Sequence, residues 1–357
     1  MIRQLSLLSV SRLVINIRIA IISCFLVGLP GLAIAEQPLT KIAFGSCIRQ
    51  DKPQPIWNAV NAYHPEVFVL TGDNIYGDSE DMKVLRAKYD LLGNDEGFKK
   101  MRQQSRLLAT WDDHDYGVND GGIEYPMRKE SQVEFNRFFK VPANSPRRSR
   151  PGVYDSLSIG PKGKRVQFIL LDTRYFRTKL KRWPDPKKRP TPGPYAPNPA
   201  DDASVLGETQ WKWLEDQLKQ PAEVRIVVTS IQAVAAENGW ETWNNFPKER
   251  QRLFDLIRTT KADGVVMVSG DRHLGEMSRI SAKETGIAYP IVDFTSSSLN
   301  QPSNPKNKHE PNRYRVGENY LLVNFGTIEI NWTGKTPAVT LAIRDIDGKV
   351  VLKHKAF

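Results

Sequence analysis

The chain has 357 residues, of which 40% are apolar, and it carries a formal net charge of +11 at pH 7. This length and apolar content allow a substantial core in one large domain or two modest ones. The positive charge favours anionic substrates such as phosphate esters, nucleotides or lipid headgroups, although it also fits a basic surface that only confers solubility and weak adhesion. No zinc-finger spacing, RNA-recognition motif or basic helix with interleaved aromatic residues occurs, so no specific nucleic-acid partner is expected.

The first 35 residues have the composition of a secretory signal peptide. A lead with three arginines is followed by an apolar stretch over residues 19–29 and by Ala33-Ile34-Ala35, a small-residue cleavage pattern. Because the apolar stretch is short for a membrane span, we expect cleavage and export to the periplasm or beyond the cell, with no stable membrane span after processing. An uncleaved N-terminal anchor is the alternative. Cleavage would remove three arginines and no acidic residue, which lowers the charge from +11 to +8 and leaves residues 36–357.

Short apolar runs alternate with helical patterns along the rest of the chain. Runs rich in β-branched residues indicate buried strands, which we predict over residues 41–47, 66–71, 106–111, 165–171, 225–231 and 265–269. Helices are predicted over about 55–63, 80–92, 95–104, 127–139, 210–218 and 248–259. Residues 179–203 are rich in proline and basic side chains, which no regular element tolerates, so we expect a long excursion over the site or the surface.

The pattern changes from Tyr320 onward. Apolar and polar residues alternate with period two over 320–332 and 338–357, with a turn at Asp347-Gly348, which indicates antiparallel hairpins. Alternating strands and helices followed by terminal hairpins predict two facing sheets wrapped by helices. No internal repeat or clean boundary divides residues 36–357, so we expect one catalytic domain.

Four predicted strands end in side chains of the types that bind metal ions. In chain order these are Cys47, Asp73 with Tyr76, Asp113 with His114, and Asp271 with His273. Ligands of layered α/β folds collect at the carboxyl ends of the strands. Carboxylates suit hard cations and can bridge two of them, whereas thiolate and phenolate together favour a strongly Lewis-acidic ion such as ferric iron. The pattern therefore predicts a metal site built for hydrolysis.

Cys47 is the only cysteine left after cleavage, because Cys24 lies in the predicted signal peptide. A lone thiol forms no internal disulfide, so it is either buried and inert or bound to a metal. Its place at a strand end among acidic clusters favours the metal.

Local spacing suggests how the later ligands are shared. Asp113 and His114 are adjacent, so in an extended or turn conformation they point in different directions, and one would bind metal while the other faces the substrate. Asp271 and His273 are two residues apart and would project from one side of a short extended segment as two ligands of a second metal.

Seven segments, taken as an ordered set, resemble the PhoD-like alkaline phosphatase family, a branch of the calcineurin-like metallophosphatases. They are FGSC (44–47), TGDNIYGD (71–78), TWDDHD (110–115), LLDTRYFR (170–177), LGETQWKWL (206–214), SGDRH (269–273) and FTSSSLN (294–300). The resemblance implies a four-layer αββα sandwich. It also implies a site containing iron (Fe³⁺) with calcium, or another divalent mixture that includes zinc, manganese or magnesium.

The resemblance also implies roles for single residues. Cys47 stands where most metallophosphatases place a histidine, and with Tyr76 it would hold the ferric ion. Asp73 would bridge the two metals. Asp113 occupies the position usually taken by a ligating asparagine, and His114 that of the proton donor.

Two positions depart from the pattern of the superfamily. Asp271 and His273 replace the paired histidines of the last motif, and the strand end at 229–232 lacks the usual histidine, which leaves Gln232 as the candidate ligand there. Family members often carry a twin-arginine signal, whereas this chain has no Arg-Arg pair in its first 35 residues. The export route is therefore open.

Hydrolysis of phosphate monoesters is the function that this ligand set favours. Two cations would polarise the phosphoryl oxygens and lower the pKa of a shared water, which attacks phosphorus in line with the leaving alkoxide. His114 would protonate the leaving oxygen. Arg49 or Arg174 would meet the charge on the equatorial oxygens, with a surface salt bridge as the alternative for each.

Two other functions remain open at this point. Diester cleavage, including phospholipase-D-like attack on lipid headgroups, would use the same metals with a different segment lying over them. Residues 179–203 are the candidate for that segment. A non-catalytic exported protein that holds phosphate or polyanions is the alternative from another class, and the intact set of predicted ligands argues against it.

Overall fold

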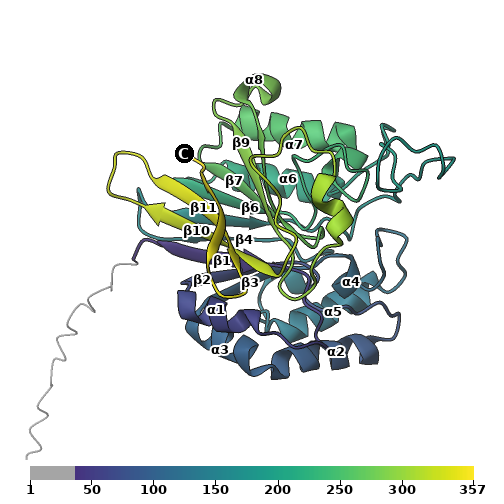
Figure 1. Cartoon of the computed structure of the whole chain (residues 1–357), viewed down its shortest axis with the longest axis horizontal. Helices are drawn as coiled ribbons and strands as arrows, with labels where there is room; N and C mark the ends of the chain where they lie inside the picture. Colours follow the sequence, from purple (N-terminus) through teal and green to yellow (C-terminus); the bar gives the residue numbers. More distant parts are fainter. Residues whose placement is uncertain (1–36) are drawn as a thin grey trace, which may run out of the picture. The chain divides into compact units, whose positions relative to one another are not determined.

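Two six-stranded sheets pack face to face in the computed structural model, which describes residues 37–357 (Figure 1). The predicted signal peptide lies outside the described residues and stays a prediction. In the first sheet the order is β12-β11-β10-β1-β2-β3. The bounds are β1 Lys41–Gly45, β2 Val67–Thr71, β3 Arg106–Thr110, β10 Asn324–Asn331, β11 Ala338–Asp345 and β12 Val350–Lys355. Strands β1, β2 and β3 are parallel, and β10 to β12 form the predicted antiparallel hairpins.

The second sheet has the order β4-β5-β6-β7-β9-β8. Its bounds are β4 Asp155–Ile159, β5 Val166–Leu170, β6 Val224–Val228, β7 Val265–Ser269, β8 Gly275–Ile280 and β9 Ile291–Ser296. The four central strands are parallel, and the two edge strands are antiparallel to their neighbours. Strands β4, β8 and β9 were not predicted. The edge strands β4 and β8 contain mostly polar or small residues, so they lack the apolar run on which the prediction depended.

Helices cover the outer face of each sheet, which confirms the αββα sandwich (Figure 1). Four pack on the first sheet: α1 Ile56–Tyr63, α2 Met82–Asn94, α3 Glu96–Gln104 and α5 Arg128–Phe138. Two pack on the second sheet: α6 Gly207–Leu218 and α7 Pro247–Thr260. The short elements are α4 Asp113–Tyr116, α8 Ala282–Thr285, and the 3-10 helices Pro146–Arg148, Trp243–Asn245 and Pro305–His309. None of the helices in residues 37–357 is long and apolar enough to cross a membrane.

Side-chain alternation explains why the central strands are apolar on both faces. In β2, Val67 and Val69 point into the core between the sheets, whereas Phe68 and Leu70 point toward the helices. In β7, Val266 and Val268 likewise point into the core between the sheets, whereas their neighbours point toward the helices. A parallel strand covered on both faces reads as a continuous apolar run, which is why these strands were predictable.

Capping residues define where two helices on the first sheet begin. The side chain of Asp81 accepts a hydrogen bond from Lys83 N at the start of α2, and Asp95 accepts one from Phe98 N at the start of α3. Each satisfies a backbone N–H that has no partner within the helix. The chain between β2 and β3 therefore runs through α2 and α3 on the outer face of the sheet, and it leaves the carboxyl ends of the strands open.

Candidate active site

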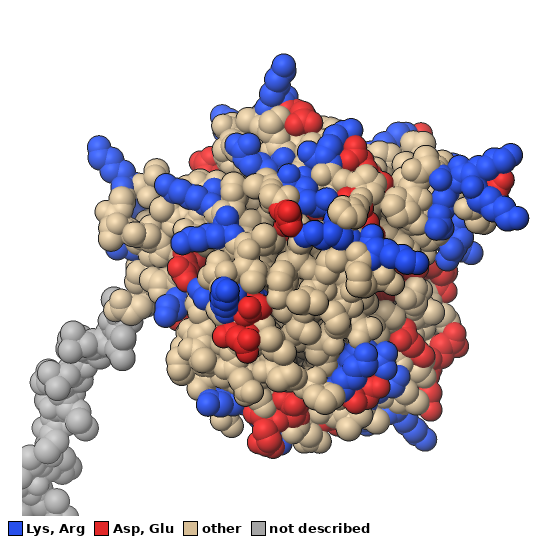
Figure 2. Space-filling view, viewed as in Figure 1, with Lys and Arg blue, Asp and Glu red and all other residues tan. Residues whose placement is uncertain are grey.

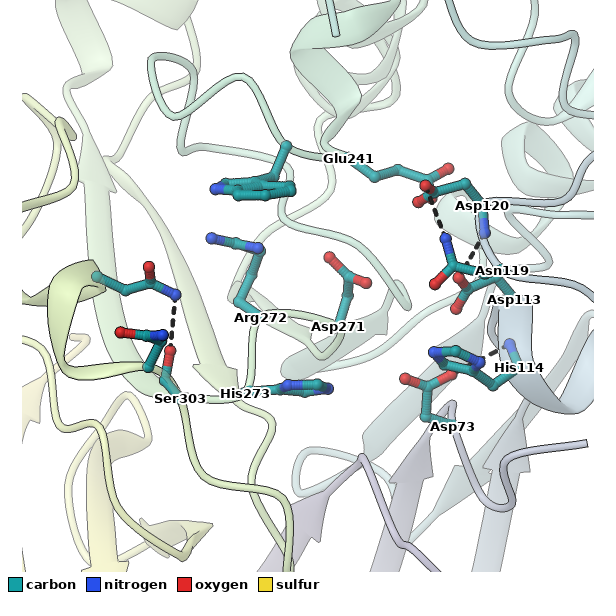
Figure 3. Close-up of a pocket in the computed structure, with 13 residues that line it drawn as sticks. Asp73, Asp113, His114, Asn119, Asp120, Glu241, Asp271, Arg272, His273 and Ser303 are labelled. Atoms are coloured by element: carbon teal, nitrogen blue, oxygen red, sulfur yellow. Dashed lines mark hydrogen bonds between the residues drawn. The ribbon is translucent and has the colours of Figure 1, made fainter. Parts of the chain in front are cut away.

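A cavity of about 290 Å³ lies at the carboxyl ends of the strands (Figure 3). Polar side chains from both sheets and from three loops line it: Asp73, Asp113, His114, Asn119, Asp120, Trp240, Glu241, Asp271, Arg272, His273, Ser303, Asn304 and Asn307. Five of the nine predicted site residues line it: Asp73, Asp113, Asp271, His273 and the predicted proton donor His114.

Left-handed backbone turns present four of the predicted ligands at the site. Cys47, Asp73, Asp271 and His273 have φ of 62°, 47°, 68° and 56°, values that L-residues other than glycine seldom adopt. The turn after β2 also requires Gly72, because a Cβ there would lie 2.5 Å from Asp112 Cβ.

One side of the site, which we call the thiol side, consists of Cys47, Tyr76 and His273. Ligand atoms of Cys47, Asp73 and His273 all lie within 4.8 Å of one another. The Cys47 thiol donates to Asp73 Oδ2 at 3.4 Å, and the Tyr76 hydroxyl lies 2.8 Å from His273 Nε2. Burial, followed by the Asp73 carboxylate, raises the pKa of the Cys47 thiol, and burial likewise raises the pKa of Tyr76. Both groups would lose a proton on binding a metal.

The other side, which we call the carboxylate side, consists of Asp112, Asp113 and Asp271, whose oxygens approach one another within 4.8 Å. Asp113 also groups with Asp73 and His114 at the same spacing. Burial and the Asp113 carboxylate raise the pKa of Asp271 to about 7. Burial acts in the same direction on Asp113, but Arg174 and His114 outweigh it and hold its pKa below the ordinary value. Asp73 therefore joins the two sides.

The structure corrects the prediction that Asp271 and His273 hold one metal together. The segment between them is not extended, because both residues have left-handed φ. Asp271 groups with Asp112 and Asp113, whereas His273 groups with Cys47 and Asp73. Asp113 and His114, expected in an extended or turn conformation, instead open the short helix α4.

Arg174 does not contact the cavity, contrary to the role predicted for it. Its side chain is fully buried behind the carboxylate side, where it donates to Asp112 Oδ1 and, at 2.6 Å, to Glu241 Oε2. Arg177 pairs with the same Glu241 at 2.9 Å. These two buried cations offset the charge of the carboxylates, so Arg174 positions the site and does not touch a substrate.

Arg49 is also absent from the cavity lining. Its Nη2 pairs with Asp51 Oδ2 at 2.8 Å, and its guanidinium carbon lies 5.1 Å from the ring centroid of Tyr76, outside the thiol side. The structure thus contains the surface salt bridge that was the alternative role for Arg49. A contact between Arg49 and the phosphoryl oxygens stays a prediction.

Asp78 orients His114. His114 Nδ1 lies 2.7 Å from Asp78 Oδ1, and the imidazole packs on the ring of Tyr76 with centroids 4.2 Å apart. Burial alone would lower the pKa of His114, but the carboxylates of Asp113 and Asp73, with the hydrogen bond to Asp78, raise it to about 11. Asp78 belongs to the segment TGDNIYGD, so the sequence contained it without showing which carboxylate would reach the imidazole.

Gln232 is not a ligand in this arrangement. Its Nε2 donates to Glu276 Oε2 at 2.9 Å and to Thr295 Oγ1 at 3.0 Å, and its Oε1 accepts from Asn238 Nδ2. Both polar atoms are thus engaged away from the cavity. The prediction of Gln232 as the ligand after β6 is wrong.

Sequence patterns missed several residues of the site, of which Arg272, Asp120 and Glu241 line the cavity and Asp112 lies beside it. Asp112 and Arg272 lie inside the segments TWDDHD and SGDRH, but the residues predicted as ligands there were their neighbours Asp113, Asp271 and His273. Asp120 and Glu241 form a further acidic group with Asp113, and both lie in loops without any periodic pattern. Only long-range packing brings these loops to the strand ends.

The donor set fits metal ions. Asp112 Oδ2 and Asp113 Oδ1 are buried and have no hydrogen-bond partner among residues 37–357. Buried carboxylate oxygens without donors are costly unless a cation binds them. The thiol side adds sulfur, phenol oxygen and imidazole nitrogen, so the two sides suit different ions.

The fold therefore has two facing mixed sheets with helices outside, and groups that could hold metal ions lie at the carboxyl ends of its strands. A family model described as PhoD-like phosphatase matches residues 42–336. The chain belongs to the PhoD-like phosphatase family.

Individual relatives agree with this assignment. Alkaline phosphatase D of Bacillus subtilis (strain 168) is 22% identical over 281 residues, which are 72% of this chain and 47% of that protein, so the chain spans about half the length of this relative. Among solved structures, the structure of PhoD superposes with a TM-score of 0.65 at 16% sequence identity. The match covers 90% of this chain and 72% of the PhoD chain.

Two further solved structures share the fold. GAP50, the anchor in the inner membrane complex of Plasmodium, has a TM-score of 0.55 at 14% identity, with 90% of this chain and 89% of that one covered. A dimetal phosphatase from Danio rerio has a TM-score of 0.53 at 12% identity, with 90% and 99% covered. At these identities the likeness shows the fold alone.

Proposed function

We propose that this protein is a metal-dependent hydrolase of phosphoric esters that acts on phosphomonoesters. The observation that carries the proposal is the position of Asp73, whose carboxylate groups with Cys47 and His273 on one side and with Asp113 and His114 on the other. A carboxylate shared in this way is what a two-metal site requires.

Each side would hold its own ion. Cys47, Tyr76 and His273 with Asp73 suit ferric iron, and Asp73 with Asp113 and Asp271 suits calcium or another divalent ion such as zinc, manganese or magnesium. When bound, such a pair supplies Lewis acidity to the phosphoryl oxygens and lowers the pKa of water.

His114 holds the proton that the leaving group needs. Its imidazole faces the cavity, and Asp78 orients it through Nδ1. Burial lowers the pKa of His114, but the neighbouring carboxylates, including Asp78, raise it above its ordinary value. A positioned acid of this kind contributes about 10²–10⁴-fold to the rate. We therefore assign protonation of the departing alkoxide to His114 Nε2.

The experiment removes His114 from the metal-loaded protein. His114→Ala should retain the metals and lose about 10²–10⁴-fold in kcat, most steeply for esters with poor leaving groups, when a series of aryl phosphates is assayed. Asp78→Asn, which keeps the imidazole and weakens its orientation, should lose less. An equal loss on every ester would contradict the acid role, and tight phosphate binding by wild type without turnover would identify a non-catalytic binding protein instead.

Diester hydrolysis is the second candidate, and the Pro-rich segment 179–203 is the observation that favours it. The Tyr195 hydroxyl donates to Asp120 Oδ2, and Gly193 N and Tyr195 N donate to Asn238 O and Gly239 O, so the segment reaches the cavity wall. Figure 2 shows Lys and Arg side chains gathered on the projecting loop; its exposed basic residues are Lys179, Lys181, Arg182, Lys187, Lys188 and Arg189. Comparing p-nitrophenyl phosphate with bis(p-nitrophenyl) phosphate separates the two candidates.

Export belongs to the proposal as well. The pattern over residues 1–35 supports a signal peptide and a periplasmic or secreted protein. N-terminal sequencing of protein from the exported fraction tests it, since a first residue near Glu36 is expected and an intact Met1 would contradict cleavage.

A further inference from the structure

Arg272 is an arginine that lines the cavity, whereas the two arginines selected from the sequence, Arg49 and Arg174, do not. It lies between Asp271 and His273, so its backbone is held by the same turn that presents those two ligands. Its side chain is 8% exposed, and it lies among the cavity-lining residues drawn in Figure 3.

A buried clamp holds the guanidinium in place. Arg272 Nη2 donates to Glu310 Oε2 at 2.7 Å, and Trp240 Nε1 donates to Glu310 Oε1 at 2.9 Å. The guanidinium carbon lies 5.4 Å from the Trp240 ring centroid. One carboxylate therefore fixes both the cation and the ring on which it packs, and a side chain fixed in advance loses little entropy when it binds a ligand.

The clamp leaves donors of Arg272 without a partner. A guanidinium has five N–H groups, and the hydrogen bond to Glu310 uses one of them. Arg272 Nε is buried and has no partner among the residues described. Because planar guanidinium N–H groups match the oxygens of phosphate and carboxylate, an anion is the ligand that this wall suits.

The position of Arg272 relative to His114 identifies which oxygens it would meet. Figure 3 shows the two side chains on opposite sides of the cavity, with Asp271 between them. His114, as the proposed acid, marks the side of the leaving group. A phosphoryl group bound between them therefore turns an oxygen that does not leave toward Arg272.

We propose that Arg272 binds this non-leaving oxygen and thereby selects monoesters over diesters. The proposal rests on the proposed function and deepens it. In a monoester the oxygen is an unesterified, charged acceptor that a guanidinium binds strongly. In a diester the same direction can hold the second ester oxygen, which is a weak acceptor and carries a substituent against the Trp240–Glu310 clamp. Trp240 and Glu310 are positioning residues in this arrangement.

The test compares Arg272→Gln and Arg272→Lys with a matched control. Arg252 on α7 also packs on a tryptophan, Trp211, with 4.6 Å to the ring centroid, and its Nη2 donates to Glu208 Oε2 at 3.0 Å, but it does not line the cavity. Arg252→Gln therefore removes a similar stacked and paired arginine elsewhere. The readouts are kcat/KM for p-nitrophenyl phosphate and bis(p-nitrophenyl) phosphate, the Kd of inorganic phosphate by calorimetry, and metal content.

Arg272→Gln should lower kcat/KM for the monoester and weaken phosphate binding by about 10- to 100-fold, the usual worth of a hydrogen bond to a charged group. The diester should change much less, so the ratio of the two esters shifts toward the diester. Arg272→Lys should recover part of the phosphate affinity, and Arg252→Gln should match wild type.

Two results would overturn the proposal: equal losses on both esters, or phosphate affinity unchanged in Arg272→Gln at wild-type metal content. Trp240→Phe keeps a ring beside Arg272 and removes only the donor to Glu310, so an intermediate loss of phosphate affinity is expected. Phosphate binding needs no turnover. If wild type cleaves neither ester while Arg272→Gln still loses phosphate, the hydrolase function fails and anion binding at Arg272 stands, without its role in ester selection.

Discussion

The thiol side and the carboxylate side of the site contrast in their donor atoms and in what lies behind them. Cys47 and Tyr76 are buried groups with raised pKa values, so they are neutral until a cation displaces their protons. Asp113 is held charged, and the buried Arg174 lies behind it. One edge of the protein therefore presents thiol, phenol and imidazole donors beside a group of carboxylates that has a buried arginine behind it. Such a pair suits two different ions.

Asp73 gives the largest expected effect, because it is the residue that both sides share. Asp73→Asn keeps the side-chain shape and tolerates the left-handed backbone, but it removes the charge between the two ions. Since a metal ion contributes several kcal/mol to the transition state, kcat/KM for a monoester should fall by at least about 1000-fold. Elemental analysis should show both ions diminished. Loss of one ion alone would mean that Asp73 belongs to a single side.

Arg174 gives the next effect, which concerns the stability of the carboxylate side. Arg174→Leu leaves Asp112 buried without its cation, while Arg177 still pairs with Glu241. Removing one partner of a buried ion pair costs about 3–5 kcal/mol. Urea denaturation of the metal-free variant should show a loss of this size. Arg258→Leu is the control, because its pair with Asp255 at 2.9 Å is nearly half exposed and contributes at most about 1 kcal/mol. Similar losses in both variants would remove Arg174 from its positioning role.

Cys47 gives the smallest effect and separates the two sides most cleanly. Cys47→Ser should reduce iron content and lower iron affinity by at least about 10- to 100-fold, the cost of losing even an outer partner of a metal ligand. The ion on the carboxylate side should be retained. Metal analysis of protein purified from the exported fraction measures both. If iron is absent from active wild type, or unchanged in the variant, Cys47 is a packing residue and the ions must be reassigned from Asp73 outward.

Central strands and their terminal ligands were predictable for a local reason. An apolar run such as VFVLT in β2 must be covered on both faces, and the residues that follow it emerge at a sheet edge. Cys47, Asp73, Asp113 and Asp271 were placed correctly at that edge on this basis. The helices were found within a few residues of their bounds because their periodicity and caps are also local.

Edge strands and partners could not be predicted in the same way. Strand β8, with the sequence GEMSRI, is held by pairing with β9, which no local pattern indicates. The pairing of Asp78 with His114 spans 36 residues, and Glu241 meets Arg174 across 67. These contacts depend on how loops return over the strand ends.

By itself, the sequence determined the sandwich, its main strands and helices, and the residue types that gather at one edge, because burial period and strand-end position are properties of short segments. The tertiary structure decided how those residues divide. Left-handed turns placed Asp271 and His273 in different groups, and burial turned Arg174 away from the cavity. Packing of distant loops set Arg272 into the cavity wall instead, since the direction of a side chain at a turn depends on what the rest of the chain packs against it.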